Sequence, residues 1–128
     1  MSSYKDLDIY KISLELFYIV HPASLKLPKY ELYELGSQLR RSSDTVVTNI
    51  VEGYGRKSYK AEFIRFLTFS WSSCLETVNH LEKINHLYFG TIENLEDLII
   101  RYNELSAKIF QFYQICRTKL ENLIFTKY

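Results

Sequence analysis

Residues 49–58 read NIVEGYGRKS, and this stretch decides how many helices the chain contains. It holds two glycines one residue apart, an Arg-Lys pair and a serine, which can build either a phosphate-binding loop or the junction of two helices. The G-x-G at 53–55 lacks the other residues of a P-loop or a dinucleotide-binding fingerprint. We therefore interpret the stretch as a helix that stops at Gly55 and a second helix that begins after Ser58, a good N-cap.

Apolar residues recur at steps of three and four on both sides of this junction, which predicts helices almost from end to end. The first helix is expected from about Asp6 to His21, because the two prolines of HPASLKLPK would interrupt it. The second is expected to begin near Pro28 and the third after residue 58. Gly90 followed by Thr91 predicts a helix stop and the N-cap of a fourth helix.

The four helices each carry one main apolar stripe with a period of roughly seven residues, and their connections are short. This pattern specifies an all-α, up-down-up-down antiparallel four-helix bundle that forms a single domain over residues 1–128. The expected core positions are Leu7, Tyr10, Leu14 and Phe17; Leu32, Leu35, Leu39, Val46, Ile50 and Gly53; Phe63, Leu67, Ser70, Cys74, Val78, Leu81 and Ile84; and Leu95, Leu98, Tyr102, Leu105, Ile109, Phe112, Cys116 and Leu120.

Several helices are apolar on more than one face, the first and the third among them. A lone bundle of this size would expose much of that surface, and large exposed apolar patches usually mark a protein interface. Homo-oligomerisation is the simplest outlet, and a thick core with some exposed aromatic residues is the alternative. The additional apolar residues are Ile9, Ile12, Leu16 and Ile19 in the first helix and Ile64, Phe66, Phe69 and Trp71 in the third.

Several classes of protein are disfavoured. Cys74 and Cys116 form no CxxC motif and are interpreted as core residues of a reducing compartment, with a disulfide as the less favoured alternative. The chain has no apolar run of membrane-spanning length and no signal-peptide core at its N-terminus, so a cytoplasmic protein without membrane contact is expected. His80 and His86 lie six residues apart and His21 is isolated, so no metal site, cofactor or catalytic residue is predicted.

A stripe of hydrogen-bonding side chains runs along the second helix beside its apolar stripe. Steps of three and four place these residues on one face, and Glu52 and Arg56 form a favourable i,i+4 pair. Ser42, Ser43 and Gly53 flank the stripe and would let another backbone come close. A structural or subunit-interface network, a ligand-facing surface and a plain solvated face all remain open. The stripe consists of Gln38, Arg41, Thr45, Asn49, Glu52 and Arg56.

Basic residues gather in the same region. Residues 40–70 contain six Lys/Arg and three Asp/Glu, whereas residues 71–100 contain one and five. Tyr54 and Tyr59 lie among the cations and could stack on bases. This cluster is a candidate nucleic-acid-binding site, and the alternative is a solubilising surface that forms salt bridges with residues 71–100. Its members are Arg40, Arg41, Arg56, Lys57, Lys60 and Arg65.

The segments SQLRRSSDTVVTNIVEGYGRKS (37–58) and EFIRFLTFSWSSCLETVNHL (62–81) resemble the four-helix-bundle proteins of the 23S ribosomal RNA intervening-sequence family. Five positions depart from the family pattern: Ser42, Ser43, Val47, Val51 and Ser72. The matching positions are Ser37, Gln38, Leu39, Arg40, Arg41, Asn49, Ile50, Glu52, Gly53, Gly55, Arg56, Glu62, Phe63, Arg65, Phe66, Leu67, Ser73 and Glu76.

The resemblance implies a ring-like homopentamer and a similarity to accessory proteins of diversity-generating retroelements, which bind nucleic acid and a reverse transcriptase. The leading hypothesis is a non-enzymatic homo-oligomer that binds structured RNA or DNA through the basic cluster. The second is a protein-interaction scaffold that docks a partner, such as a reverse transcriptase, through Phe69 and Trp71. An enzyme centred on Glu52 and Arg56 is the least favoured hypothesis.

Overall fold

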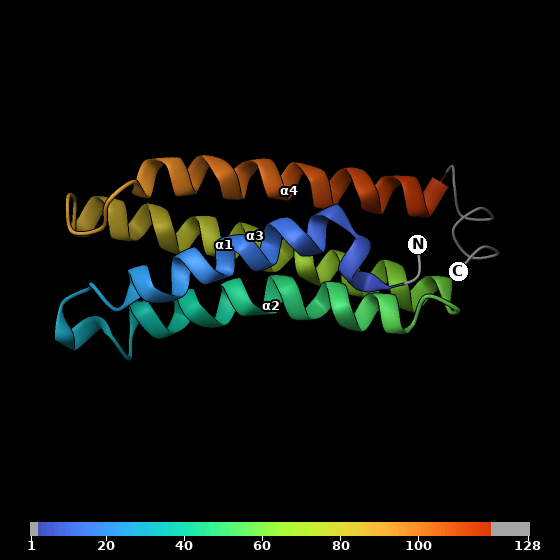
Figure 1. Cartoon of the computed structure of the whole chain (residues 1–128), viewed down its shortest axis with the longest axis horizontal. Coiled ribbons are helices and arrows are strands. Elements are labelled where there is room, and N and C mark those ends of the chain that lie inside the picture. Colours follow the sequence, from blue (N-terminus) through green and yellow to red (C-terminus); the bar gives the residue numbers. More distant parts are fainter. Residues whose placement is uncertain (1–2, 119–128) are drawn as a thin grey trace.

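A computed structural model describes residues 3–118, and all of its regular structure in this range is helical. Four long helices follow one another with short connections, as the sequence predicted (Figure 1). Two short 3-10 helices precede the first and second of them. The elements are η1 (Tyr4–Asp6), α1 (Asp8–Ser24), η2 (Lys29–Glu31), α2 (Leu35–Gly55), α3 (Lys60–Leu87) and α4 (Leu95–Thr118).

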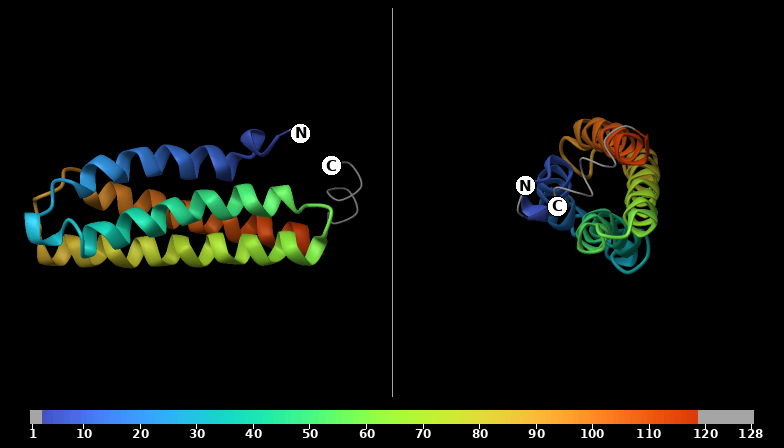
Figure 2. Two further views of the ribbon diagram at one scale, coloured as in Figure 1. Left: turned by 90° about the horizontal axis from the view of Figure 1, so that it is seen from below. Right: turned by 90° about the vertical axis from the view of Figure 1, so that its right-hand side faces the viewer.

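The helices surround one core in an up-down-up-down order. Each helix packs against its neighbour in the sequence, and α1 also packs against α4, so that the bundle closes. The end-on view in Figure 2 shows this ring of four helices. The α2–α3 turn, η1 and the end of α4 lie at one end of the bundle, and the other two connections lie at the opposite end (Figure 1).

Most of the predicted core is confirmed. Every predicted core position of α3 is buried, and so are those of α4 except Phe112, which is half-buried, and Leu120, which lies outside the described residues. In the second helix, Leu39, Val46, Ile50 and Gly53 are buried. Two positions of that stripe are only half-buried, because they lie in or near the connection that leads into α2: Leu32 and Leu35.

The core face of α1 differs from the prediction. Leu7 is buried, but the rest of the predicted stripe is half-buried: Tyr10, Leu14 and Phe17. The buried line of α1 is Ile9, Ser13, Leu16 and Val20. Apolar spacing did not predict this buried line, because Ser13 is polar and yet occupies one of its core positions. The Ser13 hydroxyl donates a hydrogen bond to the Tyr10 carbonyl at 3.0 Å, which reduces the cost of burying it.

The seam between α2 and α3 is lined with small residues, as predicted for the flank of the polar stripe. The Ser70 hydroxyl donates to the Val46 carbonyl at 2.7 Å, and Thr77 donates to the Ser42 hydroxyl at 2.9 Å. A Cβ atom added at Gly53 would lie 3.0 Å from the Cβ of Phe66. The backbone that approaches α2 is therefore that of α3.

The helix boundaries correct four predictions. The first helix runs two residues past Pro22, and the Ser24 hydroxyl bonds to the His21 carbonyl at 2.7 Å in its last turn. The second helix was predicted to begin near Pro28. The segment that follows Pro28 is instead the short η2, and α2 begins at Leu35. The N-cap position of α3 is Tyr59 rather than Ser58. Thr91 lies in the α3–α4 connection, and α4 begins after Asn94, whose φ of 57° lies in the left-handed region.

The two cysteines are free and buried, as predicted for core residues. Burial raises the pKa of the Cys74 thiol and that of the Cys116 thiol to about 12 each, so both are protonated at neutral pH. No helix in residues 3–118 combines the length and apolarity needed to cross a membrane. Within the same residues, no His, Cys, Asp and Glu side chains gather as a metal-binding group.

Candidate nucleic-acid interface

Four basic residues lie in the α2–α3 turn and the first turns of α3, at one end of the bundle. Arg56 and Lys57 are in the turn and Lys60 and Arg65 are in α3, and the four are called here the basic corner. Gly55 is the last residue of α2, as predicted. The turn is closed by its own backbone, because the Arg56 N–H donates to the Gly53 carbonyl at 3.0 Å and the Tyr59 N–H donates to the Arg56 carbonyl at 2.8 Å. The basic side chains therefore extend from a backbone that is held by hydrogen bonds.

Two arginines of the basic corner lie over aromatic rings of α3. The guanidinium carbon of Arg56 is 4.8 Å from the ring centroid of Phe66, and that of Arg65 is 5.3 Å from the centroid of Phe69. The exposed fractions of the two arginine side chains are 50% and 63%. Cation–π contact fixes where each charge lies while leaving donors open to solvent.

Lys57 is held in a similar way by α2. Its Nζ atom lies 4.0 Å from the ring centroid of Tyr54, whose ring is buried and makes an edge contact with Tyr4 of η1. The Tyr54 hydroxyl is enclosed and finds no hydrogen-bond partner among residues 3–118. Tyr54 is therefore a support for Lys57 and not a free ring that could stack on a base.

Glu62 is the carboxylate that organises the basic corner. Its Oε1 atom is 3.5 Å from Nη1 of Arg56, and its Oε2 atom is 3.6 Å from Nη1 of Arg65. Arg56 thus pairs across the turn with Glu62, and the predicted pair with Glu52 is wrong because Arg56 lies beyond the end of α2 and faces α3. These two arginines do not bridge to residues 71–100 either, whose acidic residues lie on later turns of α3 and beyond.

Arg40 and Arg41 lie far from the basic corner. Arg56 comes sixteen positions after Arg40, just past the end of α2, and at 1.5 Å per residue this is an axial rise of about 24 Å. Nη1 of Arg40 donates to the Ser24 hydroxyl at 2.8 Å, and Nη2 donates to the Leu32 carbonyl at 2.6 Å. Arg40 therefore ties the α1–α2 connection to α2, while Arg41 is exposed. The six predicted cations form two groups at different ends of α2.

The polar stripe lies on the outer surface of α2, except that its last member, Arg56, lies past the end of α2 and contacts α3. All of its residues are exposed except Asn49, which is half-buried, so the stripe does not enter the bundle interior. The Thr45 hydroxyl donates to the Arg41 carbonyl of its own helix at 2.6 Å. A subunit interface, a ligand-facing surface or a solvated face remain the alternatives for this stripe.

A second surface, the aromatic groove, lies between α3 and α4 and is lined by Thr68, Trp71, Phe110 and Tyr113. The rings of Trp71 and Phe110 are 5.3 Å apart, and the groove holds about 100 Å³. The scaffold hypothesis assigned Trp71 and Phe69 to one docking surface, but Phe69 lies against Arg65 of the basic corner. Phe110 was missed because it lies off the α4 core stripe; its spacing of three from Tyr113 was the available signal.

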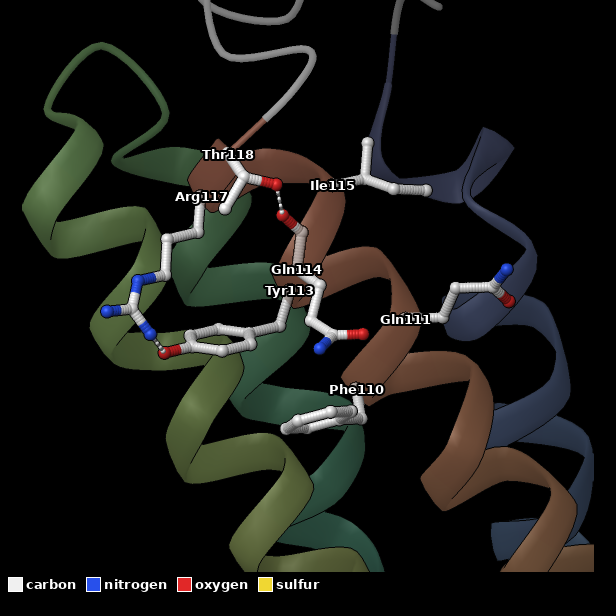
Figure 3. Close-up of a pocket in the computed structure, with 7 residues that line it drawn as sticks. All are labelled: Phe110, Gln111, Tyr113, Gln114, Ile115, Arg117 and Thr118. Atoms are coloured by element: carbon white, nitrogen blue, oxygen red, sulfur yellow. Dashed lines mark hydrogen bonds between the residues drawn. The ribbon is translucent and has the colours of Figure 1, made fainter.

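A larger hollow, of about 470 Å³, lies along the last turns of α4 (Figure 3). Arg117 donates to the Tyr113 hydroxyl at 3.1 Å and Thr118 donates to the Gln114 carbonyl at 2.7 Å, so these polar groups already have partners. All of its described lining residues belong to α4, and no second described helix closes it. We therefore do not treat it as a ligand site.

The model of the 23S rRNA-intervening sequence protein family matches residues 5–111. The chain belongs to this family. The match with the 23S rRNA-intervening sequence proteins spans α1, α2, α3 and most of α4, and it includes the basic corner and the polar stripe. No curated protein matches the chain.

Proposed function

We propose that this member of the family is a non-enzymatic homo-oligomer, a ring-like pentamer, that binds RNA or DNA through the basic corner. The observation that carries the proposal is the arrangement of Arg56, Lys57 and Arg65, each placed over an aromatic ring at one end of the bundle. The ring contacts restrict these cations, so less conformational entropy is lost when they meet phosphates. Glu62 contacts both arginines, but its single negative charge offsets only one of their two positive charges.

One basic corner alone is a weak site, because the chain as a whole carries a net charge of only +1. Several copies in one assembly would bind a single nucleic acid together, and avidity raises the affinity without any new contact. Phosphate contacts also release counterions, so the affinity should fall steeply as salt is added.

The double variant Lys57→Gln and Arg65→Gln should bind structured RNA about tenfold more weakly at low salt, because two phosphate contacts are lost. Its plot of log affinity against log salt should be shallower by about one to two. Filter binding with rRNA fragments at several salt concentrations measures both quantities. The matched control is Lys83→Gln with Lys108→Gln, which removes the same charge from exposed positions of α3 and α4. Equal losses in the two double variants, or salt-independent binding, would contradict the proposal.

The second candidate is a protein-interaction scaffold, for example an accessory subunit that docks a reverse transcriptase. The observation that favours it is the aromatic groove, where Phe110 is 38% exposed beside Trp71. Exposed aromatic side chains in a hollow are the usual anchors of a protein interface. Under the leading proposal the same groove contributes to self-assembly.

Phe110→Ser should weaken self-assembly about tenfold or more, since it removes an aromatic side chain that the subunit interface would bury. The molar mass measured by light scattering over a dilution series reports this change. Phe89→Ser is the control, because Phe89 is 78% exposed in the α3–α4 connection, away from the groove. Arg56→Ala should leave the mass unchanged. If Phe110→Ser leaves the mass unchanged but abolishes binding of a protein partner, the groove serves partner docking and not self-assembly.

A further inference from the structure

Tyr59 is the most exposed of the aromatic residues that lie beside the basic corner. Its side chain is 70% exposed, although its backbone is bonded on both sides. The Tyr59 N–H donates to the Arg56 carbonyl at 2.8 Å, and its own carbonyl accepts from the N–H groups of Glu62 and Phe63 at 3.0 Å each. The ring is therefore presented to solvent from a fixed point of the turn.

Exposure alone does not single out Tyr59, because Tyr30 and Tyr33 are 72% and 86% exposed near the opposite end of the bundle. What differs is the surrounding charge. Tyr30 and Tyr33 each directly precede a glutamate, and Lys29 is the one cation within three residues of either. Tyr59 has three cations within three residues, Arg56, Lys57 and Lys60, against the single carboxylate of Glu62. An exposed ring among cations can meet a base and its phosphate together.

The two arginines extend the same platform. The guanidinium carbons of Arg56 and Arg65 lie over the rings of Phe66 and Phe69, while both arginine side chains remain at least half exposed. Unpaired bases stack on aromatic rings and on arginine planes alike. A base pair inside a duplex offers neither face, because both are covered by its neighbours.

We propose that Tyr59, with Arg56 and Arg65, forms a stacking platform for unpaired nucleotides of RNA or single-stranded DNA. This inference rests on the proposed nucleic-acid binding and defines which part of a structured nucleic acid the basic corner contacts. Duplex regions would supply phosphate contacts only, and loops or single strands would supply phosphates and bases together.

The test compares fluorescence anisotropy of short labelled oligonucleotides at low salt: a single strand, its duplex and a hairpin with a loop, each as RNA and as DNA. The unmodified chain should bind the single strand and the hairpin about tenfold more tightly than the duplex. Tyr59→Leu should remove that preference, and Tyr59→Phe should keep it, because phenylalanine retains the ring. Tyr33→Leu is the matched control and should change nothing.

The outcomes separate the two levels of the proposal. Equal binding of duplex and single strand, or a preference that survives Tyr59→Leu, overturns the stacking platform while leaving nucleic-acid binding intact. No binding of any oligonucleotide at low salt overturns the proposed function and the platform with it. The RNA and DNA arms show which nucleic acid supplies the unpaired bases.

Discussion

Gly53→Leu is expected to destabilise the protein by about 3 kcal/mol or more, because it places a side chain inside the α2–α3 seam. The first added atom would lie 3.0 Å from the Cβ of Phe66 and 3.4 Å from Cδ1 of Phe63. The Cβ of Phe66 cannot swing away as a side-chain tip could, since it is fixed to the α3 backbone. The two helices would have to separate, and buried apolar contacts along the seam would be lost.

Gly53→Ala is a milder version of the same test, in which two effects oppose each other. Alanine favours a helix by about 1 kcal/mol relative to glycine, but the close contact with Phe66 remains. We expect the contact to dominate and the free energy of unfolding to fall by about 1–2 kcal/mol. Urea unfolding followed by circular dichroism measures it.

Gly55→Ala is the matched control for this prediction. It lies two residues away, at the end of the same helix, and a Cβ atom there would meet nothing within 4 Å. Its φ angle is not in the left-handed region, so alanine should be neutral or slightly stabilising. If Gly53→Ala and Gly55→Ala have the same effect, the contact with Phe66 does not determine the need for glycine.

The fold could be predicted because apolar spacing along α3 and α4 coincides with burial, as at Leu67 and Leu105. The prediction from apolar spacing was wrong on α1, because Ser13 occupies a core position. Its hydroxyl is tolerated there since it bonds to the Tyr10 carbonyl of the same helix. The prediction was also wrong at helix starts. Ser58 is a favourable N-cap residue, yet backbone hydrogen bonds within the turn place Tyr59 at that position. The hydrogen bonds of the turn itself therefore outweigh the capping preference of Ser58.

The candidate site was predicted only in part, because the sequence does not show which cations lie together in space. The excess of basic residues in positions 40–70 indicated cations around the α2–α3 turn. It also grouped Arg40 with Arg56, because both fall within these positions. Sixteen positions along a straight helix correspond to an axial rise of about 24 Å, so the two residues do not share one surface cluster. The ring supports of Arg56 and Arg65 were also invisible, since they depend on which way each side chain points across the turn.

Arg40→Met is expected to lower the free energy of unfolding by about 2–3 kcal/mol, because two hydrogen bonds from a charged donor disappear together. The Leu32 carbonyl and the Ser24 hydroxyl each lose a donor, and the α1–α2 connection loses its tie to α2. Gly36 provides the room for this arginine, since a Cβ atom there would lie 3.2 Å from Nη1 of Arg40. Arg40→Lys should restore little, because a single ammonium group does not span both acceptors as the guanidinium fork does.

Arg41→Met is the control that separates structure from function at this end of α2. Arg41 is exposed and carries the same charge, so its replacement should leave the unfolding free energy within about 0.5 kcal/mol of the unmodified chain. Both variants should retain nucleic-acid affinity under conditions in which they are folded, because the basic corner is intact. If instead Arg40→Met is as stable as Arg41→Met, its hydrogen bonds do not anchor the connection. If either variant weakens binding as much as the change of Lys57 and Arg65, the nucleic-acid contact extends along the whole of α2, and the polar stripe on its outer face is the surface that joins the two groups of cations.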